Sequence, residues 1–165
     1  MSVGGSKSLH STIDSKVIAE LEKDVRYISN MVKQRGREIL NHYPITPPQF
    51  IALQWLLDSG DLTIGELSKK MYLAFSTTTD LVDRMEKNEL IERIRDPKDR
   101  RVVRIHLLER GKDIIDEVID KRQQYLRDVL KSYSSDEVET LRRSMTQLFE
   151  EMKHQEQTQD EDKES

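Results

Sequence analysis

The stretch LTIGELSKKMYLAFSTTTDLVDRMEKNELIE (residues 62–92), followed directly by RIRDPKDRRVVRIHL (residues 93–107), decides the fold. Thr63 and Glu66 have the spacing of a capping box, which predicts that a short helix opens there. A second short helix is predicted over residues 76–87, because a run of Ser and Thr suits a helix start better than a helix interior. The first part of the stretch therefore predicts two amphipathic helices joined by a tight turn.

The second part of the stretch changes to a period of two. Val103 and Ile105 fall on one face, whereas Arg104 points the other way, which is the alternation of a strand. Residues 96–99, Asp-Pro-Lys-Asp, have turn chemistry with Pro at the second position. Two strands joined by a loop are therefore predicted over residues 90–107, a β-hairpin that follows a helix-turn-helix. We call this hairpin the wing.

Helical periodicity returns on both sides of this region. Apolar residues from Val17 to Ile39 recur at spacings of three, four and seven, and Thr46 with Gln49 forms another capping box. The predicted fold is mainly α with a small β-hairpin wing, a winged helix-turn-helix core flanked by long dimerisation helices. Its parts are a flexible leader (1–13), an N-terminal dimerisation helix (14–45), a winged helix-turn-helix region (46–108), C-terminal dimerisation helices (109–153) and a disordered acidic tail (154–165).

Composition limits the class of protein. The chain has 165 residues, enough for one domain with a real core. Its net charge is −4, so any nucleic-acid surface must be local. It contains no cysteine, which excludes disulfides and thiolate zinc sites on this chain. No apolar run is long enough to span a membrane, and the N-terminus does not resemble a signal peptide, so we expect a cytoplasmic protein without membrane contacts.

The second helix of the helix-turn-helix is the predicted recognition helix. Such a helix enters the major groove with its N-terminal side chains against base edges. The hydroxyl residues there and one cation further on are the predicted contacts: Ser76, Thr77, Thr78, Thr79 and Arg84. Asp80 and Asp83 count against this interpretation because they repel phosphate. On this evidence alone, the segment is equally compatible with an ordinary helical hairpin.

The wing favours DNA binding. Six basic residues between positions 93 and 104 face only two aspartates, a local net charge of +4. Such a concentration beside a helix-turn-helix indicates a phosphate-facing surface, although each cation singly would suit a solvated hairpin. We predict that Lys98, Arg100 and Arg101 hold the wing against phosphates and the minor groove. Asp99, two residues before Arg101, is predicted to pair with that guanidinium and hold it extended.

With these motifs in place, LTIGELSKKM and STTTDLVDRMEKNELIERIRDPKDRRVVRIHLLERG resemble the MarR family (multiple antibiotic resistance regulators). The resemblance is most specific at the Asp-Pro-Lys-Asp-Arg-Arg segment of the wing. It implies a homodimeric repressor, or less often an activator, that binds a palindromic operator. It also implies dimerisation through the first helix and the last two, and a cleft for a small-molecule effector.

The sequence departs from the family pattern at four positions. Ala74 replaces a common capping residue, so the recognition helix is expected to start at Ser76, and Leu108 replaces a common capping Thr. Asp80 stands where a basic or neutral residue is usual. Glu89 stands where Gly is usual, and a positive φ there would cost about 1 kcal/mol.

Two further hypotheses remain beside a DNA-binding regulator. The acidic net charge would suit a winged-helix protein-interaction module that does not bind DNA. An enzyme has little support: the four histidines are scattered, and no phosphate loop or nucleophile elbow is present, so no catalytic, cofactor or metal site is predicted. Tyr27, His42, Tyr43 and Trp55 would suit a ligand cleft, but ordinary packing explains them as well. For the terminal helices, a monomer that folds them back on its core is the alternative to a homodimer.

Overall fold

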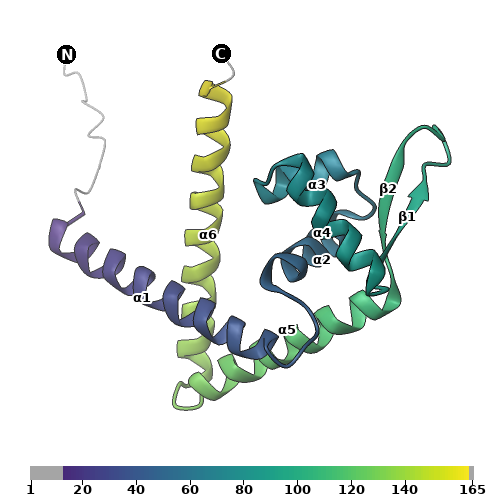
Figure 1. Cartoon of the computed structure of the whole chain (residues 1–165). Helices are drawn as coiled ribbons and strands as arrows, with labels where there is room; N and C mark the ends of the chain where they lie inside the picture. The colour runs from purple at the N-terminus through teal and green to yellow at the C-terminus, as the bar shows by residue number, and fades with distance from the viewer. Residues whose placement is uncertain (1–12, 164–165) are drawn as a thin grey trace, which may run out of the picture. The chain divides into compact units, whose positions relative to one another are not determined.

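The structure, a computed structural model, describes residues 13–163. It is mostly helical with a single two-stranded antiparallel hairpin among these residues, which confirms the predicted fold class (Figure 1). The chain divides into two compact units between Ile119 and Asp120. The elements in chain order are α1 (Ser15–Leu40), α2 (Pro47–Ser59), α3 (Ile64–Met71), α4 (Phe75–Lys87), β1 (Ile91–Arg95), β2 (Val103–Leu107), α5 (Glu109–Val129) and α6 (Ser135–Lys163).

Helix α1 begins where the sequence places it. Asp14 is the N-cap, and its side chain accepts a hydrogen bond of 2.8 Å from the backbone N–H of Lys16. Only the C-terminal end of the helix is buried, through Gly36, Ile39 and Leu40. The rest of its apolar stripe is exposed, from Val17 onward: Val17, Ile18, Leu21, Val25, Ile28, Met31 and Val32.

Two capping boxes start the helices that follow. The Thr46 N–H donates to Gln49 at 2.9 Å, and the Thr63 N–H donates to Glu66 at 2.8 Å, while each threonine hydroxyl accepts from the partner's backbone N–H. Each box satisfies donors that a helix N-terminus otherwise leaves unpaired. Both predicted helix starts are therefore confirmed.

The core of the first unit lies among α2, α3, α4, the hairpin and the start of α5. Its fully buried side chains come from all of these elements: Phe50, Leu53, Leu67, Val82, Met85, Leu90, Ile91, Ile105, Ile115 and Val118. Gly111 lets α5 begin close to the hairpin, because a Cβ there would lie 2.5 Å from the carbonyl oxygen of Leu90. The hairpin is thus part of the core and not an appendage.

The second unit contains the end of α5 and all of α6. Ser134 and Glu137 form a third capping box, with the Ser134 N–H donating to the glutamate at 2.7 Å. Leu141, Met145 and Phe149 lie exposed along α6. Within residues 13–163, no helix is long and apolar enough to cross a membrane.

One predicted boundary is wrong. Residues 154–165 were expected to form a disordered acidic tail, but α6 continues through residue 163. The sequence HQEQTQDEDK (residues 154–163) contains no Gly or Pro, and its Gln, Glu and Lys residues are good helix formers, so nothing local ends the helix. Residues 164–165, and residues 1–12 of the predicted leader, lie outside the described residues.

Candidate nucleic-acid interface

The turn between α3 and α4 is made by a residue that the sequence analysis did not single out. Tyr72 has φ 54°, and its N–H donates to the Lys69 carbonyl at 3.2 Å. The next N–H, from Leu73, donates to the Ser68 carbonyl at 3.0 Å. This pair of bonds is a Schellman motif, which ends α3 and redirects the chain into α4. Tyr72 itself is 93% exposed.

Helix α4 begins at Phe75, one residue before the predicted start, and Ala74 occupies the N-cap position without a side-chain hydrogen bond. Ser76, Thr77 and Arg84 are exposed on it, as the DNA-contact prediction requires. The exposed first turn also leaves backbone N–H groups available, and such a terminus favours phosphate.

Thr78 is a correction. It was predicted to contact DNA, but its side chain is fully buried and its hydroxyl donates to the Ala74 carbonyl at 3.1 Å. Thr78, Val82 and Met85 are spaced by four and three residues, so they share the face that packs on the core. Thr79 is half-buried and donates to the Phe75 carbonyl at 3.0 Å. Thr78 therefore leaves the set of proposed DNA contacts.

The end of α4 also contains a positive φ. Glu89 has φ 58°, which confirms that it takes the conformation usual for Gly at this position. Its N–H donates to the Glu86 carbonyl at 2.9 Å, and the N–H of Leu90 donates to the Met85 carbonyl at 3.0 Å. This second Schellman motif leads α4 into the wing. Arg110, at the start of α5, lies 3.5 Å from the Glu89 carboxylate.

The predicted hairpin is present and antiparallel, with Arg93 opposite Ile105. Its tip is organised around the Asp96 carboxylate, which accepts hydrogen bonds from the backbone N–H groups of Lys98 at 2.7 Å and Asp99 at 3.2 Å. Arg104 Nε donates to the same carboxylate at 2.5 Å. The Arg104 hydrogen bond, followed by the two backbone ones, lowers the pKa of Asp96 to about 2. The turn therefore depends on a charged Asp96.

The predicted pair of Asp99 and Arg101 is present. The guanidinium donates to both carboxylate oxygens, Nε to Oδ1 and Nη2 to Oδ2, each at 3.0 Å. The Arg101 backbone N–H donates to Oδ1 at 3.0 Å as well. The Arg101 hydrogen bond lowers the pKa of Asp99, so the pair is charged at neutral pH. The Arg101 side chain remains 91% exposed and is held in one orientation while free to meet a partner.

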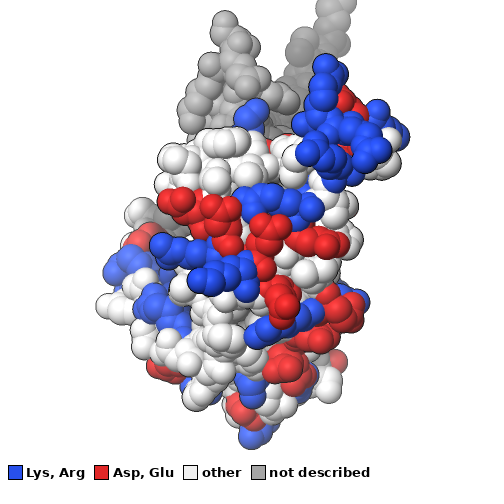
Figure 2. Space-filling view, turned by 45° about the vertical axis from the view of Figure 1, so that its right-hand side comes forward, with Lys and Arg blue, Asp and Glu red and all other residues white. Residues whose placement is uncertain are grey.

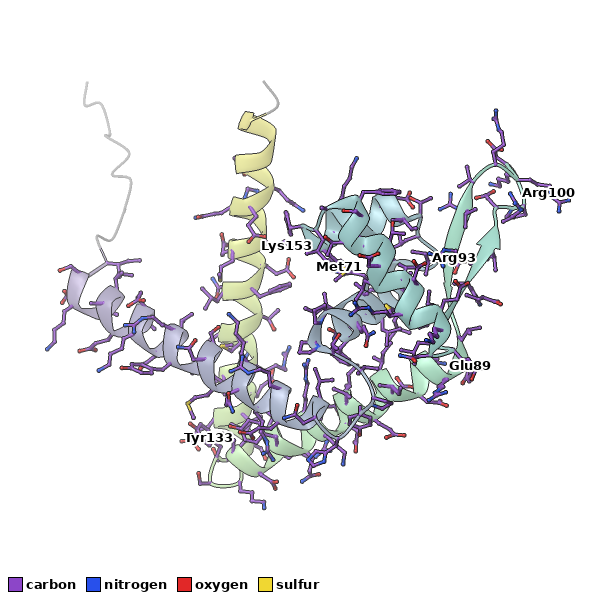
Figure 3. The ribbon with its side chains drawn as sticks, viewed as in Figure 1. Met71, Glu89, Arg93, Arg100, Tyr133 and Lys153 are labelled. Carbon is purple, nitrogen blue, oxygen red and sulfur yellow. The ribbon has the colours of Figure 1, made fainter. Side chains whose placement is uncertain are left out.

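Two of the six basic residues of the wing are not free for phosphate. Arg93 lies beside α4 (Figure 3), where it pairs with Glu86 and, at 2.5 Å, with Asp83. Arg104 pairs with Asp96 and lies 3.4 Å from Glu66 on α3. The local charge of +4 therefore overstates the cations available to DNA. The pairing with Arg93 also means that Asp83 is not an isolated negative charge on the recognition helix.

The remaining cations gather at the tip of the hairpin. Figure 2 shows dense basic side chains on this projecting part of the molecule. Arg95 donates to the Arg100 carbonyl at 2.8 Å, while Arg100 itself projects from the tip (Figure 3). Lys98 is exposed at the tip as well. The arrangement presents two chemically different surfaces, an exposed helix start with hydroxyls and a cationic tip.

Short links hold these two surfaces together. Leu62 and Ile105 form a β-bridge, with the Ile105 N–H donating to the Leu62 carbonyl at 2.7 Å. His106 Nδ1 lies 2.8 Å from an oxygen of Asp61. These links, with the Arg93 pairs, fix the wing beside α3 and α4 before any partner arrives.

Two of the four residues considered for a ligand cleft pack against the core of the first unit. Tyr43 and Trp55 are partly buried against the core. The Lys70 ammonium lies 4.7 Å from the centroid of the Trp55 ring, a cation–π contact. Tyr27 is exposed on α1.

Comparison with known proteins gives a consistent result. The model of the MarR family matches residues 45–103. The uncharacterized HTH-type transcriptional regulator YsmB of Bacillus subtilis is 62% identical over 136 residues, which cover 82% of this chain and 93% of that protein. The HTH-type transcriptional repressor MdtR of the same species is 24% identical, over 74% of this chain and 79% of that protein. The solved structure of a MarR family protein from Bacillus stearothermophilus is 60% identical, with a TM-score of 0.80 over 86% of this chain and 99% of that one.

Proposed function

The chain belongs to the MarR family of helix-turn-helix, DNA-binding transcriptional regulators, and we propose that it acts as a homodimeric repressor whose operator affinity is lowered by a small ligand. The Asp99–Arg101 pair is the observation that best links DNA binding to particular residues of this chain. It holds a 91% exposed guanidinium at the tip of the wing, where a narrow minor groove would attract it.

The proposed division of contacts follows from exposure. Ser76, Thr77 and Arg84 lie exposed on α4 and would read the major groove, with Thr79 at the margin of this face. Lys98, Arg100 and Arg101 would hold phosphates and the minor groove, with Asp99 as the positioning residue for Arg101.

Homodimerisation is supported by the apolar stripes that the helices leave exposed. On α1, exposed apolar residues continue over about four turns, from Val17 to Val32. On α6 they run from Leu141 to Met152. Exposed apolar surfaces of this length mark interaction sites. A dimer would place two recognition helices at half-sites about 34 Å apart on a palindromic operator.

The first experiment is a gel-shift titration with DNA from the chain's own promoter region. Arg101→Ala should weaken binding at least tenfold while leaving the thermal unfolding midpoint unchanged, because this side chain is exposed and, within residues 13–163, pairs only with its neighbour Asp99. Arg26→Ala is the matched control: Arg26 is also exposed and ion-paired, to Glu22 at 2.9 Å, but lies on α1. Equal affinity of Arg101→Ala and the parent protein would refute the wing assignment.

The salt dependence of the same titration addresses the alternative of a protein-interaction module, which the net charge of −4 suggests. Binding through several phosphate contacts must weaken steeply as salt rises. Absence of binding at every salt concentration would favour the alternative.

The sign of regulation is tested by a promoter fusion in a deletion strain. The ligand is tested by a screen for compounds that raise the unfolding midpoint and release the DNA.

A further inference from the structure

The two aspartates of the recognition helix have different surroundings. Asp83 lies 2.5 Å from an Arg93 guanidinium nitrogen, so its charge is compensated from the wing. Asp80, one turn earlier, is exposed. Within residues 13–163, the Asp80 side chain forms no hydrogen bond or ion pair, and Arg84 at i+4 does not bind it. An uncompensated carboxylate therefore stands on the helix that enters the DNA.

The position of Asp80 on α4 is opposite the core. Thr78, Val82 and Met85 form the buried face of the helix. Asp80 is two residues from both Thr78 and Val82, which is about 200° around a helix of 3.6 residues per turn. Ser76 precedes Asp80 by one turn and Arg84 follows it by one turn, and both are exposed. Asp80 thus lies in the middle of the surface proposed to face the major groove.

A carboxylate at this place is unfavourable unless the DNA offers it a donor. Phosphates repel it, and the acceptor atoms of guanine and the O4 of thymine repel it as well. Cytosine presents an N4 amino group in the major groove, and Asp or Glu accepts a hydrogen bond from it. Adenine N6 is also a donor, but the neighbouring N7 acceptor opposes a second carboxylate oxygen. Cytosine is therefore the base whose major-groove edge suits Asp80.

We propose that Asp80 is a specificity-determining residue, which selects a cytosine in each operator half-site by accepting a hydrogen bond from its N4 amino group. The proposal rests on the proposed function, because it requires α4 to lie in the major groove. The larger effect on the binding free energy is expected at incorrect sequences. With another base at that position, the carboxylate loses its hydrating water without gaining a hydrogen-bond donor. Asp80 then lowers the affinity for incorrect sequences as much as it supports the correct one.

The experiment is selection of bound duplexes from a library of randomised DNA, with the full-length parent protein and three variants, Asp80→Asn, Asp83→Asn and Arg84→Ala. Asp80→Asn replaces one carboxylate oxygen by an amide donor, which suits adenine through N6 and N7. Asp83→Asn is the matched control, the same chemical change one turn further along α4 at the residue that pairs with Arg93. The Asp83 side chain is 57% exposed and Asp80 is exposed as well, so neither substitution removes a core contact.

The expected result has three parts. The parent protein selects a motif with a cytosine at symmetric positions, and Asp80→Asn changes the preferred base at those positions alone. Asp83→Asn keeps the parent motif, even where its affinity is lower. In direct titrations, replacing the selected C·G pair by T·A should lower the DNA affinity of the parent protein about tenfold or more. The same replacement should leave the DNA affinity of Asp80→Ala unchanged.

Three results would overturn the proposal. If Asp80→Asn selects the parent motif with higher affinity for every sequence, Asp80 acts only by general repulsion of DNA. If the change falls at a guanine and Arg84→Ala reproduces it, Asp80 only orients Arg84. If the parent protein selects no motif at all, the proposed function itself fails, an outcome distinct from the other two because it is seen before any variant is compared.

Discussion

Arg93 is predicted to stabilise the fold and not to serve as a phosphate contact, and Arg93→Met tests this. Methionine keeps a flexible apolar stem of similar length and removes the guanidinium. In the structure that group joins β1 to α4 through Asp83 and Glu86. The Glu86 carboxylate also accepts a 3.1 Å hydrogen bond from the Arg93 backbone N–H, which the substitution leaves in place.

The size of the effect follows from exposure. The Arg93 side chain is 26% exposed, while Asp83 and Glu86 are 57% and 39% exposed, so solvent screens both ion pairs. Exposed pairs contribute about 0.2–1 kcal/mol each. Arg93→Met should therefore lower the free energy of unfolding by about 1 kcal/mol, which is about 2–4 °C in the unfolding midpoint for a chain of this size. Partial burial of Arg93 works against its charge, but the hydrogen bonds to Asp83 and Glu86 outweigh it, so its pKa is raised.

The assay is urea unfolding at one fixed protein concentration, with a double-mutant cycle that combines Arg93→Met and Asp83→Asn. The cycle should give a coupling of about 0.5 kcal/mol, since it isolates one of the two pairs. Arg95→Met is the matched control: it removes the same charge from the same strand, but among the described residues Arg95 donates only to the carbonyl oxygen of Arg100. Its effect on the unfolding free energy should be less than about 0.5 kcal/mol.

DNA binding completes the test. Arg93→Met should leave the slope of log affinity against log salt close to that of the parent protein, because no phosphate contact is lost. Removal of a true phosphate contact reduces the magnitude of that slope by about 0.9. The reasoning is refuted if Arg93→Met and Arg95→Met have equal effects on stability, or if Arg93→Met reduces the salt slope by one full contact without destabilising the protein.

Two further predictions concern the fold around the wing. Gly111→Ala should destabilise the protein by about 1–3 kcal/mol in thermal unfolding, because its Cβ would lie 2.5 Å from the Leu90 carbonyl oxygen, whereas Gly65→Ala, with no contact nearer than 3.9 Å, should not destabilise it. The pKa of Asp96 is lowered to about 2, from about 4 in an unfolded chain, so its contribution to stability is complete above pH 4 and is lost as pH falls toward 2. The difference in unfolding free energy between the parent protein and Asp96→Asn should accordingly be constant from pH 5 to 7 and should shrink as the pH falls below 4. A difference that keeps its full size at pH 2 would contradict the assignment of this stability to the charged Asp96 carboxylate.

Local signals in the sequence were sufficient for much of this architecture. The capping boxes at Thr46 and Thr63 depend on residues three apart, and the structure confirms both. The Asp99–Arg101 pair spans two residues and could be predicted for the same reason. A positive φ at Glu89 was raised by the resemblance, which has Gly at this position, and the structure contains it. These features are decided by neighbouring residues, so no knowledge of tertiary packing was required.

Features that depend on tertiary packing were missed. Arg104 and Glu66 are 38 residues apart, and their approach depends on how the hairpin packs beside α3. The burial of Thr78 could have been predicted, because it precedes Val82 by four residues and Met85 by seven and so shares their helix face. The run of hydroxyl residues was instead interpreted as one exposed set. The C-terminal extension of α6 was missed because polar composition was interpreted as disorder, although the same residues have good helix propensity.

The sorting of charges explains how an acidic protein can present a DNA-binding surface. Arg93 and Arg104 are used within the protein, and their acidic partners are thereby prevented from opposing DNA. Because these pairs hold the wing in place before binding, less conformational entropy is lost when DNA arrives. The free cations at the tip attract phosphate without regard to sequence. Selectivity must then come from α4, where the uncompensated charge of Asp80 makes incorrect bases costly as well as correct ones favourable.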